Sequence, residues 1–126
     1  AQFANVVSAE ANAAIGDVAD TWFRAWNEAD PATRAELLAA CSTTDVRLQD
    51  KWSCLQGHDD LQQHIAICLQ MAPGVTMARA GEVRQCQGTA LVEWRATDRD
   101  GNPRGQGTNV VRLGPDGRIT RVVGFW

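Results

Sequence analysis

The sequence predicts an α+β domain in which a strongly bent antiparallel sheet curls against helices and encloses an apolar pocket. Two observations support this prediction. In the N-terminal part of the chain, apolar residues recur at the spacing of amphipathic helices, whereas from Val75 onward they alternate with a period of two. Helices followed by a meander of long strands are typical of α+β domains, whose helices gather on one face of an antiparallel sheet.

Length and composition limit the class of protein. The chain has 126 residues, which favours a single domain, 1–126, with one core. The hydrophobic fraction of 44% and the charged fraction of 21% are typical of a globular protein. No apolar run reaches the ~18–20 residues that a transmembrane helix needs. With a net charge of −3 and no basic cluster, neither nucleic acid nor a membrane is a favoured partner.

Three helices are predicted, and the first two lie before residue 42. Residues 1–14 are expected to be a frayed extension and lack the basic and apolar regions of a signal peptide. A long amphipathic helix then ends near Ala29. Its apolar face consists of Ile15, Val18, Ala19, Trp22, Phe23 and Trp26. Asp30 is a good N-cap and Pro31 suits the first helical position, so a short second helix is expected over residues 32–41.

The third helix and the strands follow. The helix begins after Gly57 and is stopped by Pro73-Gly74. Its apolar stripe consists of Leu61, His64, Ile65, Cys68 and Leu69. A strand over residues 45–52 precedes this helix. The later strands are expected at residues 75–87 (with a bulge at Ala80-Gly81), 89–98, 105–113 and 118–126.

The four cysteines, Cys41, Cys54, Cys68 and Cys86, contain no C-x-x-C pair, and the two histidines do not have a helical metal spacing. We therefore expect reduced, buried cysteines and no metal. The sequence also has no Gly-rich phosphate loop and no G-x-S-x-G or H-E-x-x-H motif, so no cofactor is predicted. Reduced cysteines and a high ratio of Arg to Lys suggest a cytoplasmic protein of a bacterium.

Asp50 and His64 are the candidate catalytic residues. Asp50 continues the apolar face that Val46 and Leu48 form on their strand, and a carboxylate on such a face is a candidate acid or base. The alternative is that Asp50 lies at the strand end, faces water or caps a turn. His64 lies on the apolar stripe of its helix, where it is either a core residue or a second acid–base group. His58 is expected in solvent.

Four further residues are candidates for ligand binding. Asn109 shares a strand face with apolar residues, so its amide either orients a ligand or satisfies buried backbone groups. Trp22, Trp26 and Trp126 are expected in the core or in the pocket wall, where indole N–H groups are fixed donors. Glu93 and Arg95 alternate with buried positions and are expected on the outer sheet face or at a dimer interface.

Several segments resemble the nuclear-transport-factor-2-like superfamily, which has a cystatin-like fold. They are residues 22–30 (WFRAWNEAD), 45–50 (DVRLQD), 57–61 (GHDDL) and 116–119 (DGRI). The resemblance implies a cone-shaped barrel with a pocket between sheet and helices, and a homodimer formed through the outer sheet face. The superfamily includes ketosteroid isomerase, SnoaL-type polyketide cyclases and limonene epoxide hydrolase, together with non-catalytic binding domains.

The resemblance also assigns residue roles. The general-base Asp of ketosteroid isomerase corresponds to Asp50, and its two oxyanion-binding groups, a Tyr and a protonated Asp, correspond to Trp22 and Asn109. The base is retained and both oxyanion donors are replaced, which argues against steroid isomerisation. The expected function is cofactor-independent acid–base chemistry of isomerase, cyclase or hydrolase type on a small apolar substrate. The alternative is a non-catalytic domain for ligand binding or dimerisation.

Overall fold

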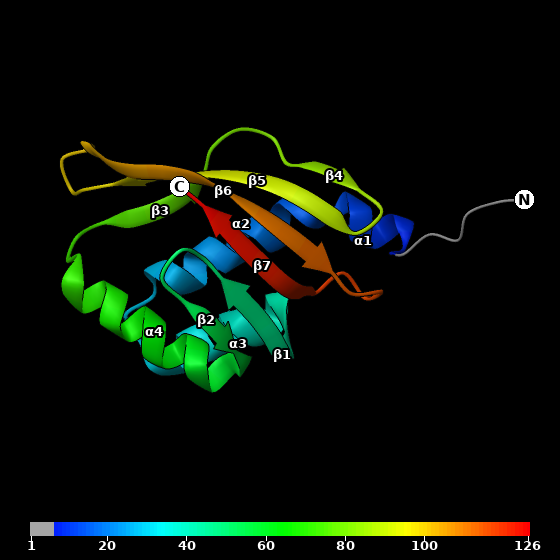
Figure 1. Ribbon diagram of the computed structural model, residues 1–126, viewed down its shortest axis with the longest axis horizontal. Helices are drawn as coiled ribbons and strands as arrows, with labels where there is room; N and C mark the ends of the chain where they lie inside the picture. Colours follow the sequence, from blue (N-terminus) through cyan, green and yellow to red (C-terminus); the bar gives the residue numbers. More distant parts are fainter. Residues whose placement is uncertain (1–6) are drawn as a thin grey trace, which may run out of the picture.

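The helices lie together on one side of the sheet (Figure 1). The computed structural model describes residues 7–126; residues 1–6 of the expected N-terminal extension lie outside this range. The four helices are α1 (Ala9–Ala13), α2 (Ile15–Asn27), α3 (Pro31–Cys41) and α4 (Gly57–Met71). In the part of the extension that the structure describes, α1 is helical and Ala11 joins the core.

The helix boundaries follow from local chemistry. The Asp30 carboxylate accepts a hydrogen bond from the backbone N–H of Thr33 at 2.9 Å and one from its hydroxyl, with Pro31 at the first helical position. Both predicted roles are thereby confirmed, and these hydrogen bonds lower the pKa of Asp30. Gly57 begins α4 with a φ of +87°, a conformation that glycine adopts without a steric penalty.

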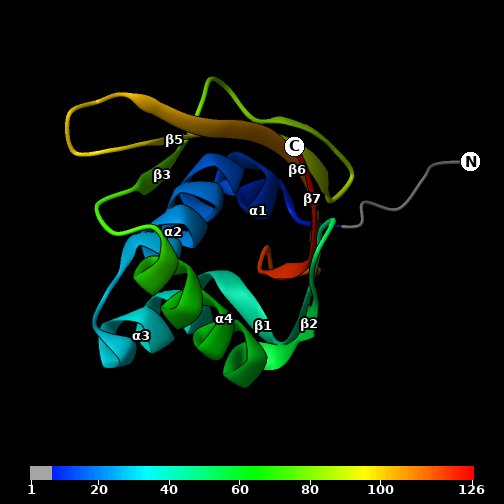
Figure 2. The ribbon, with the colours of Figure 1, turned by 60° about the vertical axis from the view of Figure 1, so that its left-hand side comes forward.

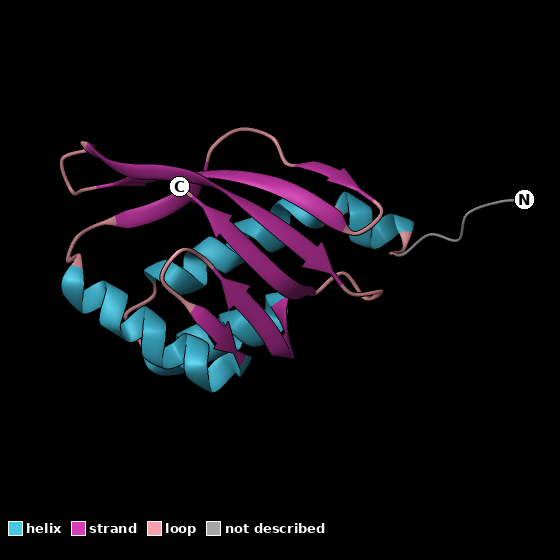
Figure 3. Cartoon of the chain, in the orientation of Figure 1, coloured by secondary structure: helices cyan, strands magenta, loops and turns pink. Residues whose placement is uncertain are grey.

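The seven strands form one mixed sheet. They are β1 (Ser42–Gln49), β2 (Cys54–Gln56), β3 (Thr76–Arg79), β4 (Arg84–Cys86), β5 (Thr89–Thr97), β6 (Pro103–Leu113) and β7 (Ile119–Phe125). Along the sheet they run in the order β2-β1-β7-β6-β5-β3, and β4 also pairs with β5. The sheet curves around the helices without closing, and the helices occupy its concave side (Figures 2 and 3).

Three features of the sheet differ from the sequence prediction. Strand β1 pairs with β7 in parallel, so the sheet is mixed where an antiparallel one was expected. The segment 75–87 forms two separate strands, β3 and β4, because the chain leaves the sheet around Gly81, whose φ is +82°. The strand expected over residues 45–52 ends at Gln49, and β2 follows after a turn. The predicted α+β class and the bent sheet are confirmed.

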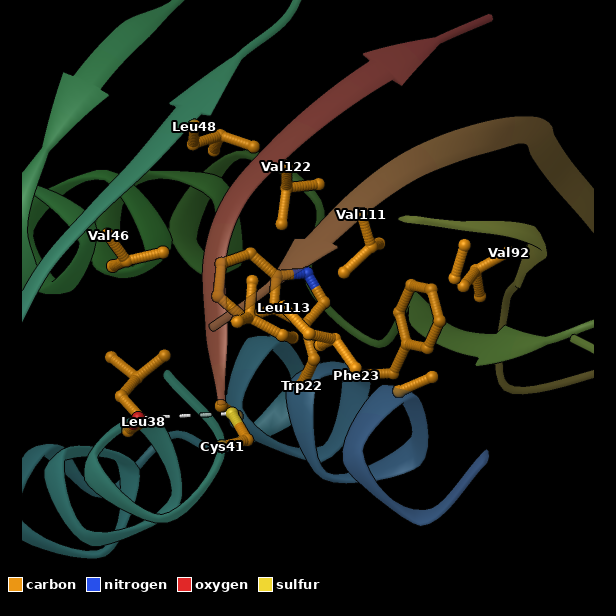
Figure 4. Close-up of a cluster of buried hydrophobic side chains, with 14 of the residues drawn as sticks. Trp22, Phe23, Leu38, Cys41, Val46, Leu48, Val92, Val111, Leu113 and Val122 are labelled. Atoms are coloured by element: carbon orange, nitrogen blue, oxygen red, sulfur yellow. Dashed lines mark hydrogen bonds between the residues drawn. The ribbon is translucent and has the colours of Figure 1, made fainter. Parts of the chain in front are cut away.

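The core lies between the inner sheet face and helices α2 and α3 (Figure 4). Trp22 and Phe23 of α2 lie below the side chains of Val111 and Val122, which project from neighbouring strands of the sheet. Helix α2 is also attached to the edge strand β3. Asn27 donates to the carbonyl of Met77 and accepts from its N–H, both at 2.8 Å, so the side chain acts as a backbone partner for an otherwise open strand edge.

No helix within residues 7–126 is long and apolar enough to span a membrane.

Packing in α4 should distinguish two isoleucines that lie two positions apart. Ile65 is 0% exposed and Ile67 is 54% exposed. We expect Ile65→Ala to lower the free energy of unfolding by about 2–5 kcal/mol, because it leaves a cavity in the core. The matched variant Ile67→Ala should change it by no more than about 0.5 kcal/mol. Urea denaturation measures both values, and equal losses would contradict the described burial.

Candidate functional site

A cavity of about 400 Å³ lies between the inner sheet face and helices α2 and α4, and its wall is mainly apolar. The lining residues are Trp22, Trp26, Leu48, Asp50, Trp52, Ser53, His64, Ile67, Cys68, Met71, Ala72, Met77, Trp94, Asn109, Gly124 and Trp126. The volume and the small number of polar groups are typical of a site for a small molecule. All five tryptophans of the chain contribute to this wall.

Asp50 lies at the turn that follows β1. Its Oδ1 accepts hydrogen bonds from the backbone N–H groups of Trp52 at 2.9 Å and Ser53 at 2.8 Å. The Asp50 N–H in turn donates to the Ser53 carbonyl at 3.0 Å. Both sequence readings of Asp50 therefore apply at once: it caps a turn and it lines the cavity. Neither side-chain bond uses Oδ2, so this oxygen can interact with a ligand.

His64 and Cys68 lie one turn apart on α4 and both line the cavity. The His64 Nε2 and the Cys68 Sγ are 3.6 Å apart. The Trp26 ring meets the imidazole edge-on, with 5.6 Å between ring centroids, which fixes the ring of His64 from a second side. Burial raises the pKa of the Cys68 thiol, and the charge of Asp50 raises it further, so the thiol stays protonated near neutral pH.

Asn109 lies opposite α4, on the inner face of β6, and is buried. Its Oδ1 accepts a hydrogen bond from the Trp94 indole N–H at 3.2 Å. This bond uses the acceptor of the amide, so Nδ2 is the group that can donate to a ligand. A further donor is the Trp26 indole N–H, which is buried without a hydrogen-bond partner in the described part of the chain. Buried donors of this kind are uncommon.

Two glycines make room for the aromatic wall. A Cβ at Gly107 would lie 2.6 Å from the Trp94 ring and 2.5 Å from the carbonyl of Phe125. A Cβ at Gly124 would lie 3.2 Å from Asn109 Oδ1. Both glycines therefore allow large side chains to lie close to the backbone of the inner sheet face.

The cavity brings together every residue that the sequence singled out for the site: Asp50, His64, Trp22, Trp26, Asn109 and Trp126. Their catalytic and binding roles stay predictions. Sequence reasoning did not assign Cys68 and Trp52 to the site. Cys68 lies on the same helical stripe as His64, which is a signal that could have identified it. Trp52 continues the alternation of Val46, Leu48 and Asp50 in the sequence, which is a comparable signal, although it follows the end of β1 in the structure.

The structure corrects two other predictions. His58 is not free in solvent, because its Nε2 lies 2.9 Å from the Ser42 hydroxyl oxygen. The cysteines are reduced, but only Cys41 is buried, Cys68 is half-buried, and Cys54 and Cys86 are exposed. Within residues 7–126, no group of three His, Cys, Asp or Glu side chains is placed to hold a metal ion.

The curved sheet, the helices on its inner side and the cavity between them define a nuclear-transport-factor-2-like domain with a cystatin-like fold. The chain belongs to the family of SnoaL-like domains, which matches residues 19–122. The resemblance seen in the sequence is thereby confirmed. Among curated proteins, none matches the chain significantly.

Solved structures support the same assignment. A proposed isomerase of the SnoaL-like family from Agrobacterium tumefaciens is 31% identical, with a TM-score of 0.81 over 86% of this chain and 93% of that one. A proposed polyketide cyclase from Sinorhizobium meliloti is 20% identical, with a TM-score of 0.67 over 86% and 94%. A cystatin-fold protein of unknown function from Nostoc punctiforme is 16% identical, with a TM-score of 0.72 over 94% and 92%. The last two comparisons show the fold alone.

The four cysteines should react with iodoacetamide in an order set by exposure and pKa. Burial raises the pKa of Cys41 to about 12, so almost none of it is the reactive thiolate at about pH 8. We expect Cys54 and Cys86 to be labelled first, Cys68 more slowly, and Cys41 only after unfolding in urea. Peptide mass spectrometry follows each site separately. Labelling of Cys41 in the native protein at the rate of Cys54 would contradict its described environment.

Proposed function

We propose that the protein is a cofactor-independent acid–base enzyme of isomerase, cyclase or hydrolase type that acts on a small apolar substrate in the cavity. The observation that carries this proposal is the Asp50 carboxylate, which lines an otherwise apolar wall and has Oδ2 outside its hydrogen bonds to the turn. Membership of the SnoaL-like family, and the 31% identical relative described as a proposed isomerase, support the same class of activity.

In this proposal Asp50 accepts a proton from the substrate or from an attacking water. The two backbone N–H groups on Oδ1 hold the carboxylate in one orientation, which places the base before the substrate arrives. A base that is fixed by the β1–β2 turn loses little freedom when the substrate binds. This local geometry therefore suits proton transfer without a metal or an organic cofactor.

The negative charge that develops on the substrate needs donors on other parts of the wall. Asn109 Nδ2 is one such donor, and the bond between Oδ1 and Trp94 fixes its direction. The indole of Trp22 positions the substrate from α2. His64, held between Cys68 and Trp26, is the candidate acid that returns a proton. These donors are amide, indole and imidazole groups, which suits a substrate with one weakly basic oxygen.

Asp50→Asn should slow proton abstraction strongly and leave the fold intact. The Asn side-chain oxygen can still accept the two backbone N–H bonds, so thermal stability should be unchanged or raised. We expect the rate to fall by about 10²–10⁴-fold, the usual contribution of a positioned base. The assay is deuterium incorporation from D₂O into a panel of small apolar ketones and esters, followed by NMR.

Asp45→Asn is the matched control, because Asp45 is exposed on the same strand and lies outside the cavity wall. It should leave the exchange rate unchanged. An Asp50→Asn protein that exchanges at the wild-type rate would eliminate Asp50 as the base.

A non-catalytic binding domain is the second candidate, and the capping role of Asp50 favours it. Because Oδ1 already stabilises the turn through two hydrogen bonds, the carboxylate has a structural reason to be present without any reaction. This candidate predicts that wild-type protein binds apolar compounds with no exchange above the buffer rate. It also predicts that Asp50→Asn binds them with unchanged affinity.

We further propose that two chains pair through the outer sheet face. Leu91 of β5, Val110 of β6 and Val123 of β7 are neighbours in the register and form an apolar strip on that face, and Phe125 is exposed farther along β7. Such a strip across adjacent strands is suited to packing against a second sheet.

Leu91→Lys should weaken this pairing, because a charge in the apolar strip loses its hydration on association. We expect a shift toward monomer in light scattering coupled to size-exclusion chromatography. Ile67→Lys on α4 introduces the same charge away from the sheet and should leave the molecular mass unchanged. A wild-type protein that is monomeric at high concentration would refute the proposed dimer.

A further inference from the structure

Two reactive side chains of α4 lie next to each other in the cavity wall. The Sγ of Cys68 and the Nε2 of His64 are 3.6 Å apart, and both residues line the cavity. Of the four cysteines, all of which lie within residues 7–126, Cys68 is the one in this wall. The edge-on contact with the Trp26 ring limits the rotation of the imidazole. A nucleophile in contact with a base that a third group orients is the arrangement used in covalent catalysis.

The surroundings of Cys68 determine how its thiol can react. Burial and then the charge of Asp50 raise the pKa of the thiol, so the resting sulfur keeps its proton. A sulfur of high pKa is the stronger nucleophile once that proton leaves. Because His64 Nε2 is in contact with Sγ, the imidazole can take the proton as sulfur forms its new bond. The pair therefore favours a compound held in the cavity over reagents that need a preformed thiolate.

The thiol lies beside apolar surface that is open to solvent. Four of the six large apolar side chains that are exposed within residues 7–126 line the cavity: Trp52, Ile67, Met71 and Trp126. Ile67 and Met71 flank Cys68 on α4. Apolar surface concentrated at one place on a protein marks a site where an apolar ligand or partner binds. The reacting compound is therefore expected to carry an apolar chain.

The wall opposite α4 supplies a group for the other end of such a compound. Asn109 Nδ2 can donate to a carbonyl oxygen of the ligand, because the Asn109 Oδ1 is engaged with the Trp94 indole. One such donor stabilises the negative charge that forms on a carbonyl oxygen when sulfur adds to a conjugated C=C bond. Addition releases no leaving group, so a base and one donor supply every group that the reaction needs.

We propose that Cys68 and His64 add the thiol across the conjugated C=C bond of an apolar α,β-unsaturated carbonyl compound held in the cavity. Sγ forms a bond to the β-carbon, the π electrons of the C=C bond shift toward the carbonyl oxygen, and the thiol proton moves to His64 Nε2. His64 then returns this proton to the α-carbon, and the product is a saturated thioether. No oxidant or reductant is needed. The reaction shares the cavity with the proposed acid–base enzyme and does not require Asp50 to act as a base.

The test compares two vinyl ketones that differ in the alkyl chain alone, methyl vinyl ketone and pentyl vinyl ketone. Peptide mass spectrometry follows the adduct on each cysteine. Methyl vinyl ketone should modify the exposed Cys54 and Cys86 first. Pentyl vinyl ketone should modify Cys68 at least about tenfold faster than Cys54, because binding places the double bond beside the thiol. The Cys68 rate should saturate with ketone concentration, and ethyl pentyl ketone, which lacks the double bond, should slow it.

Substitutions separate the role of the imidazole from that of the fold. His64→Gln should slow the Cys68 adduct by about 10²-fold or more, because the base is lost. Cys41 should stay unmodified in this variant, which would show that the core is intact. His58→Gln is the matched control, since His58 lies on the same helix outside the cavity wall, and it should leave the rate unchanged. Asp50→Asn removes a charge that raises the thiol pKa, so the adduct should form at least as fast.

Each outcome decides the proposal. Modification of Cys68 by pentyl vinyl ketone no faster than that of Cys54, a Cys68 rate without saturation, or an unchanged Cys68 rate in His64→Gln overturns it. If His64→Gln exposes Cys41, the order of labelling and the competition by the saturated ketone in wild-type protein decide alone. Fast adduct formation together with wild-type deuterium exchange in Asp50→Asn would eliminate the acid–base proposal and leave this one standing. Loss of exchange in Asp50→Asn without preferential labelling of Cys68 in wild type would do the opposite.

Discussion

The register of β6 between β5 and β7 is the constraint on which the cavity depends. It places Gly107 opposite Trp94 and Asn109 opposite Gly124, so Trp94 and Asn109 each have one cross-strand neighbour without a side chain. The Trp94 indole can then lie over the backbone of β6 and donate to Asn109. A shift of β6 by one residue in this register would move all of its inward side chains to the outer face of the sheet. The register of β6 therefore determines both the shape of the cavity and the hydrogen bond between Trp94 and Asn109.

Asp50 and Asn109 are held by hydrogen bonds that leave a second polar side-chain atom for a ligand. Asp50 is anchored through Oδ1, Asn109 through its carbonyl oxygen, and His64 through contacts with Cys68 and Trp26. A site built in this way is ordered before a ligand enters, which lowers the conformational entropy lost on binding.

Local patterns allowed much of the fold to be predicted from the sequence. The N-cap at Asp30 and the alternation in β5 depend on nearby residues alone, and both are present in the structure. The parallel pairing of β1 with β7 depends on segments far apart in the chain, which periodicity does not report. The break between β3 and β4 was read as a bulge because a left-handed glycine is compatible with either.

The site was predictable to a similar degree. The alternation of apolar residues with a period of two predicted inward positions for Asp50 and Asn109. Helical spacing predicted that Trp22 and His64 face the sheet. The hydrogen bonds that hold these groups could not be predicted, because they join separate elements or form in a turn. The exposure of Cys54 and Cys86 was missed for a related reason. Each lies on a short strand that carries little buried surface.

The position of β7 has a consequence for how the molecule is made. In the sheet β7 lies between β1 and β6, so the last strand in the chain order is an interior one. Until it is synthesised, the early β1–β2 ribbon and the later β3–β6 strands have no hydrogen-bonded connection to each other. Assembly must then wait for a pairing of high sequence separation, which is slow. Before that pairing the chain holds two unjoined half-sheets with open edges, which are prone to aggregation.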